Sequence, residues 1–556
     1  MPGDGVNVAP LPGHKILIDS PAKEPALGYK EYGRALADII NQSVPQFAVG
    51  IFGGWGSGKT TLMQEVRKGI DPKDAICVEF SAWRYEKEDH LIVPLLATIK
   101  DAIEEWASGQ DDDLGKVALQ VARTVGSVVT SLVAGLSLRF GIPKALELSF
   151  DADKALDRAA KVAAHKGQPA EQQLTSVYHA CFKALRLEFG RFLGRESQRR
   201  IVVFVDDLDR CLPKGVLQVL ESMKLFFDLH GFVFVVGLDQ QVVEWCIDVA
   251  YSRYRVQKEG ERGYQVRGSD YIKKIFQVPF TLFPVSVVQI DEFLETLVRE
   301  NGVCQSQADE IRTLVRPHLS YVVGNAGMNP REVKRFINAY TLNMKVKPNL
   351  HRQAVLALRA ITFRPDWQLV QEALYVYGEV FLETLSRQVR GEAAALSTLH
   401  RDLAKIPDSF IQYVSDGAPG NALLHARPLD EYIRSGAATG SGSSHDPRIF
   451  DLIRRVGGLR SALDSAASPG EFGQVESLVS MVAKDAESLV LQGRSELANP
   501  FVEAVRRSIE ALRAELEKGR DAFEKPEKQS QWKLDFDARI PSVTSAPVQL
   551  YQAGER

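Results

Sequence analysis

The chain has 556 residues, enough for several domains with separate hydrophobic cores. Its 45% hydrophobic and 25% charged residues are typical of globular protein. The formal net charge of -3 excludes an overall positive potential that would attract nucleic acid or anionic membranes. The 5 cysteines form no C-x-x-C pair and do not cluster with histidines, which argues against structural zinc and a disulfide framework and predicts a cytoplasmic protein.

The N-terminal residues 1–13 are rich in Pro and Gly and lack a long apolar core, so we do not expect them to be a secretory signal. Apolar residues at helical spacing then predict a helix over residues 27–41. We expect this helix to pack beside the loop that follows.

A phosphate-binding loop of the pattern G-x-x-x-x-G-K-[ST] follows the apolar run 47–52, which predicts a buried strand. Residues 61–68 predict a helix whose N-terminus faces a bound anion. In such a loop, main-chain N–H groups turn toward phosphate oxygens, the lysine neutralises the outer phosphates and the threonine hydroxyl binds Mg²⁺. The nucleotide-binding residues predicted here are Gly53, Gly54, Trp55, Gly56, Ser57, Gly58, Lys59, Thr60 and Thr61.

A helical insertion is expected after the second strand, which we predict over residues 75–80. A simple βαβ unit needs roughly 30 residues, and far more chain than that precedes the next strand signal. We therefore expect mostly helices over about residues 91–195. The uncharged stretch 125–138 is shorter than the roughly 20 residues of a spanning helix, which favours a buried or partner-facing helix over membrane insertion.

The apolar, mostly β-branched run 201–205 predicts a central parallel strand that is buried on both faces. A carboxylate at the end of such a strand lies beside the phosphate loop, so Asp206 is predicted to hold Mg²⁺ directly or through water. Asp207 would then orient or deprotonate the attacking water. For Asp209 and Arg210, a functional role and a surface ion pair remain alternatives.

The core continues with a helix over residues 216–229 and a buried strand over 232–238. Asp239 at the end of that strand is predicted to sense the γ-phosphate, with a helix N-cap as the alternative. A last core strand is expected over residues 275–283, at the edge of the sheet because it contains Pro279.

From residue 287 the pattern becomes helical. Asn329 suits the N-cap and Pro330 the first position of one such helix. Arg331 and Arg335 are four residues apart and share a face, and one of them is predicted to reach the phosphates. Solvated or ion-paired arginines are the alternative.

The C-terminal region begins with a small-residue stretch that predicts a flexible linker over residues 435–447. Residues 448–524 are mostly helical by pattern. The tail 525–556 carries Trp532, Phe536 and Tyr551, which predicts either a short docking segment or a disordered end.

Six stretches together resemble the KAP family of P-loop NTPases, and they occur in the order found in that family. They are GGWGSGKTTL at 53–62, FSAWRYEKE at 80–88, VVFVDDLDRC at 202–211, VVGLDQQVV at 235–243, YIKKIFQVPF at 271–280 and NPREVKRFIN at 329–338.

The resemblance implies an ATPase related to the signal-transducing and AAA-like P-loop groups, with a helical lid that supplies an arginine from NPREVKRFIN. Many members carry membrane helices between the two nucleotide motifs, and bacterial relatives often act in anti-phage defence beside an effector protein. The resemblance therefore implies partner proteins, a defence effector among them, and we also expect an oligomer.

The fold class expected is α/β, a P-loop NTPase core with a parallel sheet, a helical insertion between the two nucleotide motifs, and a C-terminal helical lid and helical domain. The expected divisions are an N-terminal segment and helix (1–45), the core (46–285), the lid (286–434), the linker (435–447), a helical region (448–524) and the tail (525–556).

The mechanism expected is a switch in which ATP and Mg²⁺ close the lid and hydrolysis reopens it. ATP is favoured over GTP because the chain has no N-K-x-D guanine-reading motif. We expect slow turnover, because the Asp207 side chain is shorter than that of a glutamate and reaches less far toward the attacking water. If Asp207 is not the base, Glu79 or Glu86 is the next candidate.

Two other functions remain as hypotheses. One is a scaffold that binds nucleotide without useful turnover. The other is a motor stimulated by nucleic acid, because residues 183–200 are locally basic, although a solvated helix face explains that stretch equally well.

Overall fold

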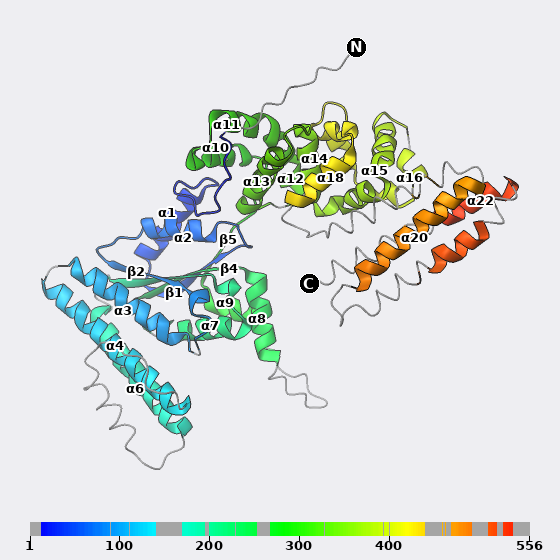
Figure 1. Cartoon of the computed structure of the whole chain (residues 1–556). Helices are drawn as coiled ribbons and strands as arrows, with labels where there is room; N and C mark the ends of the chain where they lie inside the picture. Colours follow the sequence, from blue (N-terminus) through cyan, green and yellow to red (C-terminus); the bar gives the residue numbers. More distant parts are fainter. Residues whose placement is uncertain are drawn as a thin grey trace. The chain divides into compact units, whose positions relative to one another are not determined.

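The computed structural model describes residues 13–439, except 89, 111, 141–169, 195–198, 228, 253–266, 327, 393 and 400, together with 459, 462, 469–491, 507, 510–519 and 526–537. The chain divides into two compact units, which are described separately (Figure 1). The sheet unit comprises residues 20–284 and 329–331. The helical unit comprises the described residues before 20, residues 285–328 and those from 332 onward.

The sheet unit alternates strands and helices, as expected for an α/β core. Its elements are α1 (Tyr29–Gln42), β1 (Gln46–Phe52), α2 (Lys59–Lys68), β2 (Ala75–Ser81), the 3-10 turn η1 (Ala82–Tyr85), α3 (Ile92–Ser108), α4 (Asp112–Phe140), α6 (Ala170–Phe192), β3 (Arg200–Asp206), the 3-10 turn η2 (Leu208–Arg210), α7 (Pro213–Phe227), β4 (Phe232–Leu238), α8 (Gln240–Ser252), α9 (Gly268–Ile275) and β5 (Val278–Thr281).

The five strands form one parallel sheet in the order β2-β3-β4-β1-β5, which confirms the predicted fold class. Phe52 at the end of β1 pairs with Leu238 at the end of β4, and Asp206 of β3 pairs with Ser81 of β2. Because parallel strands end at the same edge, the segments that follow β1, β2, β3 and β4 all emerge side by side. That edge carries the predicted site.

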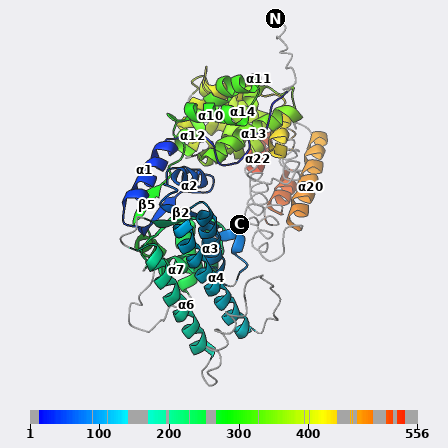
Figure 2. The same ribbon diagram turned by 90° about the vertical axis from the view of Figure 1, so that its left-hand side faces the viewer.

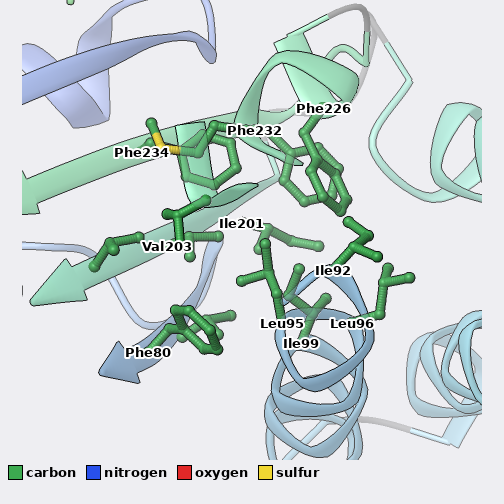
Figure 3. Close-up of a cluster of buried hydrophobic side chains, with 14 of the residues drawn as sticks. Phe80, Ile92, Leu95, Leu96, Ile99, Ile201, Val203, Phe226, Phe232 and Phe234 are labelled. Atoms are coloured by element: carbon green, nitrogen blue, oxygen red, sulfur yellow. The ribbon is translucent and has the colours of Figure 1, made fainter. Parts of the chain in front are cut away.

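The core lies on the face of the sheet that α3 and α7 cover. Ile92, Leu95 and Ile99 of α3 point toward Ile201 and Val203 of β3 in Figure 3. All seven residues of β4 are buried, which explains the continuous apolar run of that strand. At about 25 cal/mol per Å² of apolar surface removed from water, this packing is the main source of stability for the unit.

The predicted helical insertion comprises α3, α4 and α6, and α4 lies beside α6 in both ribbon views (Figures 1 and 2). The uncharged stretch 125–138 falls within α4, where Val125, Val128 and Leu132 are buried in protein contacts. Among the residues that the structure describes, we find no helix whose length and apolar content would let it cross a bilayer.

Two elements begin three residues away from the predicted position. Helix α7 begins at Pro213 rather than at 216, because proline at the first helical position loses no hydrogen bond. The last strand is limited to β5 (Val278–Thr281), since Ile275 closes helix α9. Its predicted edge position is confirmed.

The helical unit has no strand among its described residues. Its elements are α10 (Ile290–Asn301), α11 (Gln305–Glu310), the π-helical η3 (Ile311–Val315), α12 (Arg316–Ala326), α13 (Pro330–Val346), whose first two residues belong to the sheet unit, α14 (Arg352–Thr362), η4 (Pro365–Trp367), α15 (Gln368–Val389), α16 (Ala395–Leu399), η5 (Arg401–Lys405), α17 (Asp408–Val414), η6 (Pro419–His425), α18 (Leu429–Thr439), α20 (Pro469–Leu491) and α22 (Pro526–Asp537).

Residues 13–19 belong to the helical unit and not, as expected, to one N-terminal segment 1–45. The side-chain amide of Gln307 exchanges two hydrogen bonds with the main chain of Lys15, at 2.9 and 2.8 Å. The amide of Asn338 does the same with Leu17, at 2.7 and 2.8 Å. Side-chain amides thus hold this extended segment as a neighbouring strand would.

Residues 435–439 of the expected linker are helical, because α18 (Leu429–Thr439) includes them. Ser435 is buried and its hydroxyl donates to Asn343 Oδ1 at 2.9 Å, which fixes the helix where small residues suggested a flexible chain. The rest of the predicted linker lies outside the described residues.

The tail is not a disordered end over its described part, since Pro526–Asp537 form helix α22. Trp532 is buried, donates from Nε1 to the Glu515 carbonyl at 2.8 Å, and packs edge-on against Phe472 of α20. Phe536 is fully buried beside it. Tyr551 lies outside the described residues.

Candidate functional site

The loop between β1 and α2 is shaped by glycines in the left-handed region of backbone conformation. Gly56 has φ of 83° and Gly58 has φ of 96°, values that side chains disfavour. A Cβ added at Gly58 would lie 2.7 Å from the ring of Tyr29, so the loop also needs glycine for space. Helix α2 begins at Lys59, and its N-terminal N–H groups and dipole favour an anion at this point.

Tyr29 of α1 clamps the loop, a contact that the sequence did not predict. Its hydroxyl donates to the carbonyl of Ser57, and burial raises the pKa of that phenol well above its usual value. The Ser57 hydroxyl is buried and has no hydrogen-bond partner among the described residues. An unsatisfied buried hydroxyl in this loop is consistent with a polar ligand.

The Lys59 ammonium group lies inside the loop and is 8% exposed. It donates to the carbonyls of Gly53 at 2.9 Å and Gly54 at 3.3 Å, and to Asp209 Oδ2 at 3.0 Å. Asp209 is therefore in a buried ion pair with the loop lysine. The surface ion pair considered for this residue is wrong.

Thr60 and Asp206 meet at the edge of the sheet. The Thr60 hydroxyl donates to Asp206 Oδ2 at 2.6 Å, although 146 residues separate them in the chain. Burial raises the pKa of the Asp206 carboxyl, against hydrogen bonds from Thr60 and from the Asp207 amide that lower it. A cation placed here would relieve the cost of burying that charge.

These two side chains fit a magnesium ion. Mg²⁺ prefers oxygen ligands and is usually held by one or two carboxylates together with substrate phosphates and water. Among the described residues, no group of three or more His, Cys, Asp and Glu side chains is arranged to hold a metal ion. Thr60 and Asp206 would therefore supply protein oxygens, and phosphate and water would supply the rest.

Asp207 follows directly and has a left-handed backbone, with φ of 59°. Its Oδ2 accepts from the Ser81 hydroxyl at 3.2 Å, and its Oδ1 lies 2.9 Å from Arg210 Nη2. Both carboxylate oxygens thus have a partner within the chain. The contact with Ser81 was not expected from the sequence, where this residue directly followed the strand predicted over residues 75–80.

Arg210 connects this carboxylate to two exposed tryptophans. Its guanidinium carbon lies 5.6 Å from the ring centre of Trp55 and 5.6 Å from that of Trp83, distances at which cation–π attraction operates. Trp55 is 64% exposed and Trp83 is 51% exposed. Arg210 is itself exposed and pairs with Asp207, so the surface ion pair considered for this residue is present, and the two tryptophan rings are added to it.

Residues 29–344 match the model of the KAP family P-loop domain, more than half of the chain. The chain belongs to the KAP family of P-loop NTPases.

Three curated proteins resemble parts of this KAP chain. An uncharacterised protein of Methanocaldococcus jannaschii is 28% identical over 179 residues, covering 29% of this chain and 89% of that protein. The phage T7 exclusion protein of Escherichia coli is 24% identical over 314 residues, 52% of this chain and 38% of that protein. The replication and repair protein RecF of Yersinia pseudotuberculosis is 27% identical over 206 residues, 34% of this chain. The KAP chain thus covers only 38% and 53% of the last two proteins.

Asp239 of the KAP domain takes the N-cap position of helix α8. Its Oδ1 accepts from the amides of Gln241 at 3.1 Å and Val242 at 3.4 Å. A Cβ added at Gly54 would lie 3.8 Å from its Oδ2, so the same carboxylate also borders the loop. Its predicted role as a phosphate sensor stays a prediction.

Asn329 and Arg331 close over the loop of the KAP domain. Asn329 Nδ2 donates to the Trp55 carbonyl at 3.0 Å, and the Arg331 amide donates to the Gly56 carbonyl at 3.4 Å. A Cβ at Gly56 would lie 2.5 Å from Arg331 Cβ. Arg335 belongs to the helical unit, so its predicted reach to the phosphates stays a prediction.

The remaining candidates make other contacts. Thr61 is buried on α2, and Glu79 is exposed and pairs with Arg67. Glu86 accepts from the Leu212 amide beside the turn η2. The site that the structure brings together is the loop with Lys59, Thr60, Asp206, Asp207, Asp209, Arg210, Asn329 and Arg331.

Proposed function

We propose that this chain binds ATP with Mg²⁺, hydrolyses it, and uses the cycle as a switch or assembly factor with partner proteins. The observation that carries the proposal is the contact of Thr60 with Asp206 at 2.6 Å, one residue from the loop lysine. An anion-binding loop and a metal-binding carboxylate at one sheet edge are the two requirements for a bound nucleoside triphosphate.

The loop amides and the N-terminus of α2 bind the phosphate oxygens, and Lys59 neutralises the outer phosphates. When bound, Mg²⁺ withdraws charge from the β- and γ-phosphates. Thr60 and Asp206 orient this group, and the elevated pKa of Asp206 means that its ionised form gains from a cation beside it.

Asp207 is the proposed base. The oxygen of water attacks the γ-phosphorus, the bond to the bridging oxygen breaks, and its electron pair leaves on ADP. The water proton passes to the Asp207 carboxylate, which later returns it to solvent. Arg331, and Arg335 of the same helix, are proposed to neutralise charge that develops on the phosphates.

The biological setting proposed is anti-phage defence. It is supported by the likeness to the T7 exclusion protein, although that likeness covers 38% of that protein. Nucleic-acid-stimulated hydrolysis is the second candidate, favoured by the partial likeness to RecF.

The test compares the wild-type protein with Lys59→Ala and Asp207→Asn, by titration of ATP with Mg²⁺ and by phosphate release. We expect Lys59→Ala to abolish binding, and Asp207→Asn to keep binding but lower kcat by about 10² to 10⁴. Lys68→Ala, an exposed lysine on the same helix, serves as the control and should behave as wild type.

Further arms of the same assay separate the alternatives. GTP in place of ATP tests base preference, and added DNA or RNA tests the motor hypothesis. If the wild type retains ATP but releases no phosphate with or without nucleic acid, the scaffold replaces the enzyme. If it retains no ATP in the presence of Mg²⁺, the whole proposal fails.

A further inference from the structure

The phosphate loop (residues 53–60) is bonded from outside by a segment that lies far away in the sequence. Asn329 Nδ2 donates to the Trp55 carbonyl at 3.0 Å, and the Arg331 amide donates to the Gly56 carbonyl at 3.4 Å. Two neighbouring carbonyls of the loop are therefore turned toward donors that do not belong to the loop.

Helix α1 bonds the next carbonyl of the loop. The Tyr29 hydroxyl donates to the Ser57 carbonyl, and the side chain of Tyr29 is buried. Helix α1 packs closely on α2, because a Cβ added at Gly33 of α1 would lie 2.6 Å from Glu65 Cβ of α2. The hydroxyl thus reaches the loop from a helix that is fixed against the helix following the loop.

The direction of these carbonyls determines the direction of the loop amides. A peptide unit is planar and trans, so the C=O of one residue and the N–H of the next point in opposite directions. Outward carbonyls at Trp55, Gly56 and Ser57 therefore turn the next three amides inward. Gly56 and Gly58 are left-handed and Ser57 between them is not, an alternation that gathers N–H groups around an anion.

The other carbonyls at the start of the loop are bonded by the lysine that phosphate would engage. Lys59 Nζ donates to the carbonyls of Gly53 and Gly54 and to Asp209. An ammonium group has three N–H donors, so a phosphate that binds Lys59 replaces one of these bonds. The three outer donors bond carbonyl oxygens and do not compete with phosphate. They hold the loop in the same shape before and after a ligand binds.

We propose that Tyr29 and Asn329 are positioning residues that, with the Arg331 amide, form the phosphate loop before the triphosphate binds. Apparent affinity falls when only a fraction of the protein has the binding shape. Loss of a donor therefore weakens binding, whereas a saturating ligand restores the shape and leaves the chemical step unchanged. The inference rests on the proposed triphosphate binding and adds which residues outside the loop give it its shape.

Tyr29→Phe removes one donor and keeps the packing of the ring. We expect Kd and KM for ATP with Mg²⁺ to rise about two- to tenfold, the factor that one net hydrogen bond contributes to an equilibrium, and kcat to remain that of the wild type. Tyr32→Phe makes the same chemical change one turn later on α1, at a side chain that is 42% exposed, and is the control. A lower kcat with unchanged KM in Tyr29→Phe contradicts a positioning role.

Asn329→Ser removes the donor to the Trp55 carbonyl. Serine suits a helix N-cap as asparagine does, is neutral, and is too short to reach that carbonyl. We expect the same rise in Kd and KM at unchanged kcat. Asn41→Ser is the control, because Asn41 Nδ2 also donates to a carbonyl, that of Gly69 at 2.9 Å, at the C-terminal ends of α1 and α2.

The double variant Tyr29→Phe/Asn329→Ser tests whether the two donors stabilise one shape. If they do, its loss of affinity exceeds the product of the two single losses, because the second change acts on a loop that the first has already made less stable. Inorganic triphosphate with Mg²⁺ should show the same losses, since the loop contacts phosphates and not the base. Losses that only multiply, losses confined to ATP, or wild-type affinity in all three variants overturn the proposal.

Hydrogen exchange of the ligand-free protein gives a readout that needs no nucleotide. The Ser57 amide donates to the Gly54 carbonyl at 3.2 Å, a bond that belongs to the formed loop. Exchange within residues 53–62 should be faster in the two single variants and unchanged in the two controls. Unchanged exchange in both variants refutes the inference even if the wild type binds ATP. Faster exchange, in a protein whose wild type binds neither ATP nor triphosphate, refutes the proposed function alone.

Discussion

Burial keeps the imidazole of His318 neutral in the helical unit. The ring is 1% exposed, its Nδ1 lies 2.6 Å from the Tyr413 hydroxyl, and its Nε2 has no hydrogen-bond partner among the described residues. Burial lowers the pKa of His318 to about 3. Protonation therefore strongly opposes the folded state at this position.

The sign of the resulting pH effect follows from proton binding. Between the ordinary histidine pKa of about 6.5 and the folded value, the unfolded chain binds a proton that the folded chain does not, so stability falls as pH falls. At about 1.4 kcal/mol per pH unit, His318 should cost about 2 kcal/mol at pH 5. Denaturant unfolding of wild type and His318→Gln at pH 7.5 and 5.0 measures it, and equal losses in both proteins would contradict the assignment.

At the residue scale, the sequence predicts what depends on spacing. The loop pattern identifies Lys59 and Thr60, and a buried strand ending in acid identifies Asp206. Asp209 could not be assigned because its contact with Lys59 depends on the left-handed backbone at Asp207, which no pattern in a single sequence reveals. The contact of Tyr29 with the phosphate loop could not be predicted, because a tyrosine at the start of a helix can make many different contacts.

At the element scale, β4 packs against the site through a glycine. A Cβ added at Gly237 would lie 2.8 Å from Met63 Sδ, 3.2 Å from Asp206 Oδ1 and 3.5 Å from Lys59 Cβ. The absence of a side chain there lets helix α2 approach the sheet. It also leaves Asp206 in contact with Thr60.

We predict that Gly237→Ala destabilises the protein by roughly 1 to 3 kcal/mol through overpacking. It should also weaken nucleotide binding, because Asp206 and Lys59 border the added methyl group. Gly190→Ala on α6 is the matched control, since a Cβ there meets nothing within 4 Å and alanine favours a helix by about 1 kcal/mol. Chemical unfolding and ATP titration of both variants provide the comparison, and equal behaviour of the two would refute the packing argument.

Elements were predictable where apolar runs were long. Strands β1, β3 and β4 could be predicted because each is a continuous run of apolar residues. The order of the strands in the sheet could not be predicted, because no single run determines which strands are neighbours. Helix α22 was missed because its two buried aromatics, Trp532 and Phe536, are surrounded by polar residues in the sequence. The partners of Trp532, Phe472 and the Glu515 carbonyl, lie more than 10 residues away in the chain. The prediction of a flexible linker at Ser435 was wrong. The small-residue composition gave no indication of the hydrogen bond between Ser435 and Asn343, which lies far away in the sequence.

At the scale of the whole molecule, a ligand that binds only folded protein stabilises the unit that holds it. At a free concentration of about 100 times Kd, ATP with Mg²⁺ should add about 2.7 kcal/mol. Hydrogen exchange should then slow at the amides of β1, β3 and β4, and Lys59→Ala should show no slowing. Unchanged exchange of these strands in the wild type at saturation would rule out a nucleotide bound at this edge.

Neither compact unit is a single continuous stretch of chain. Residues 13–19 belong to the helical unit, the chain then builds the sheet unit to Pro284, and residues 329–331 return to it at the start of α13. A fragment designed to end at 284 would therefore lose the Asn329 amide that holds the Trp55 carbonyl. A shortened protein made to study nucleotide binding and hydrolysis should therefore keep the whole of α13 and end after Val346.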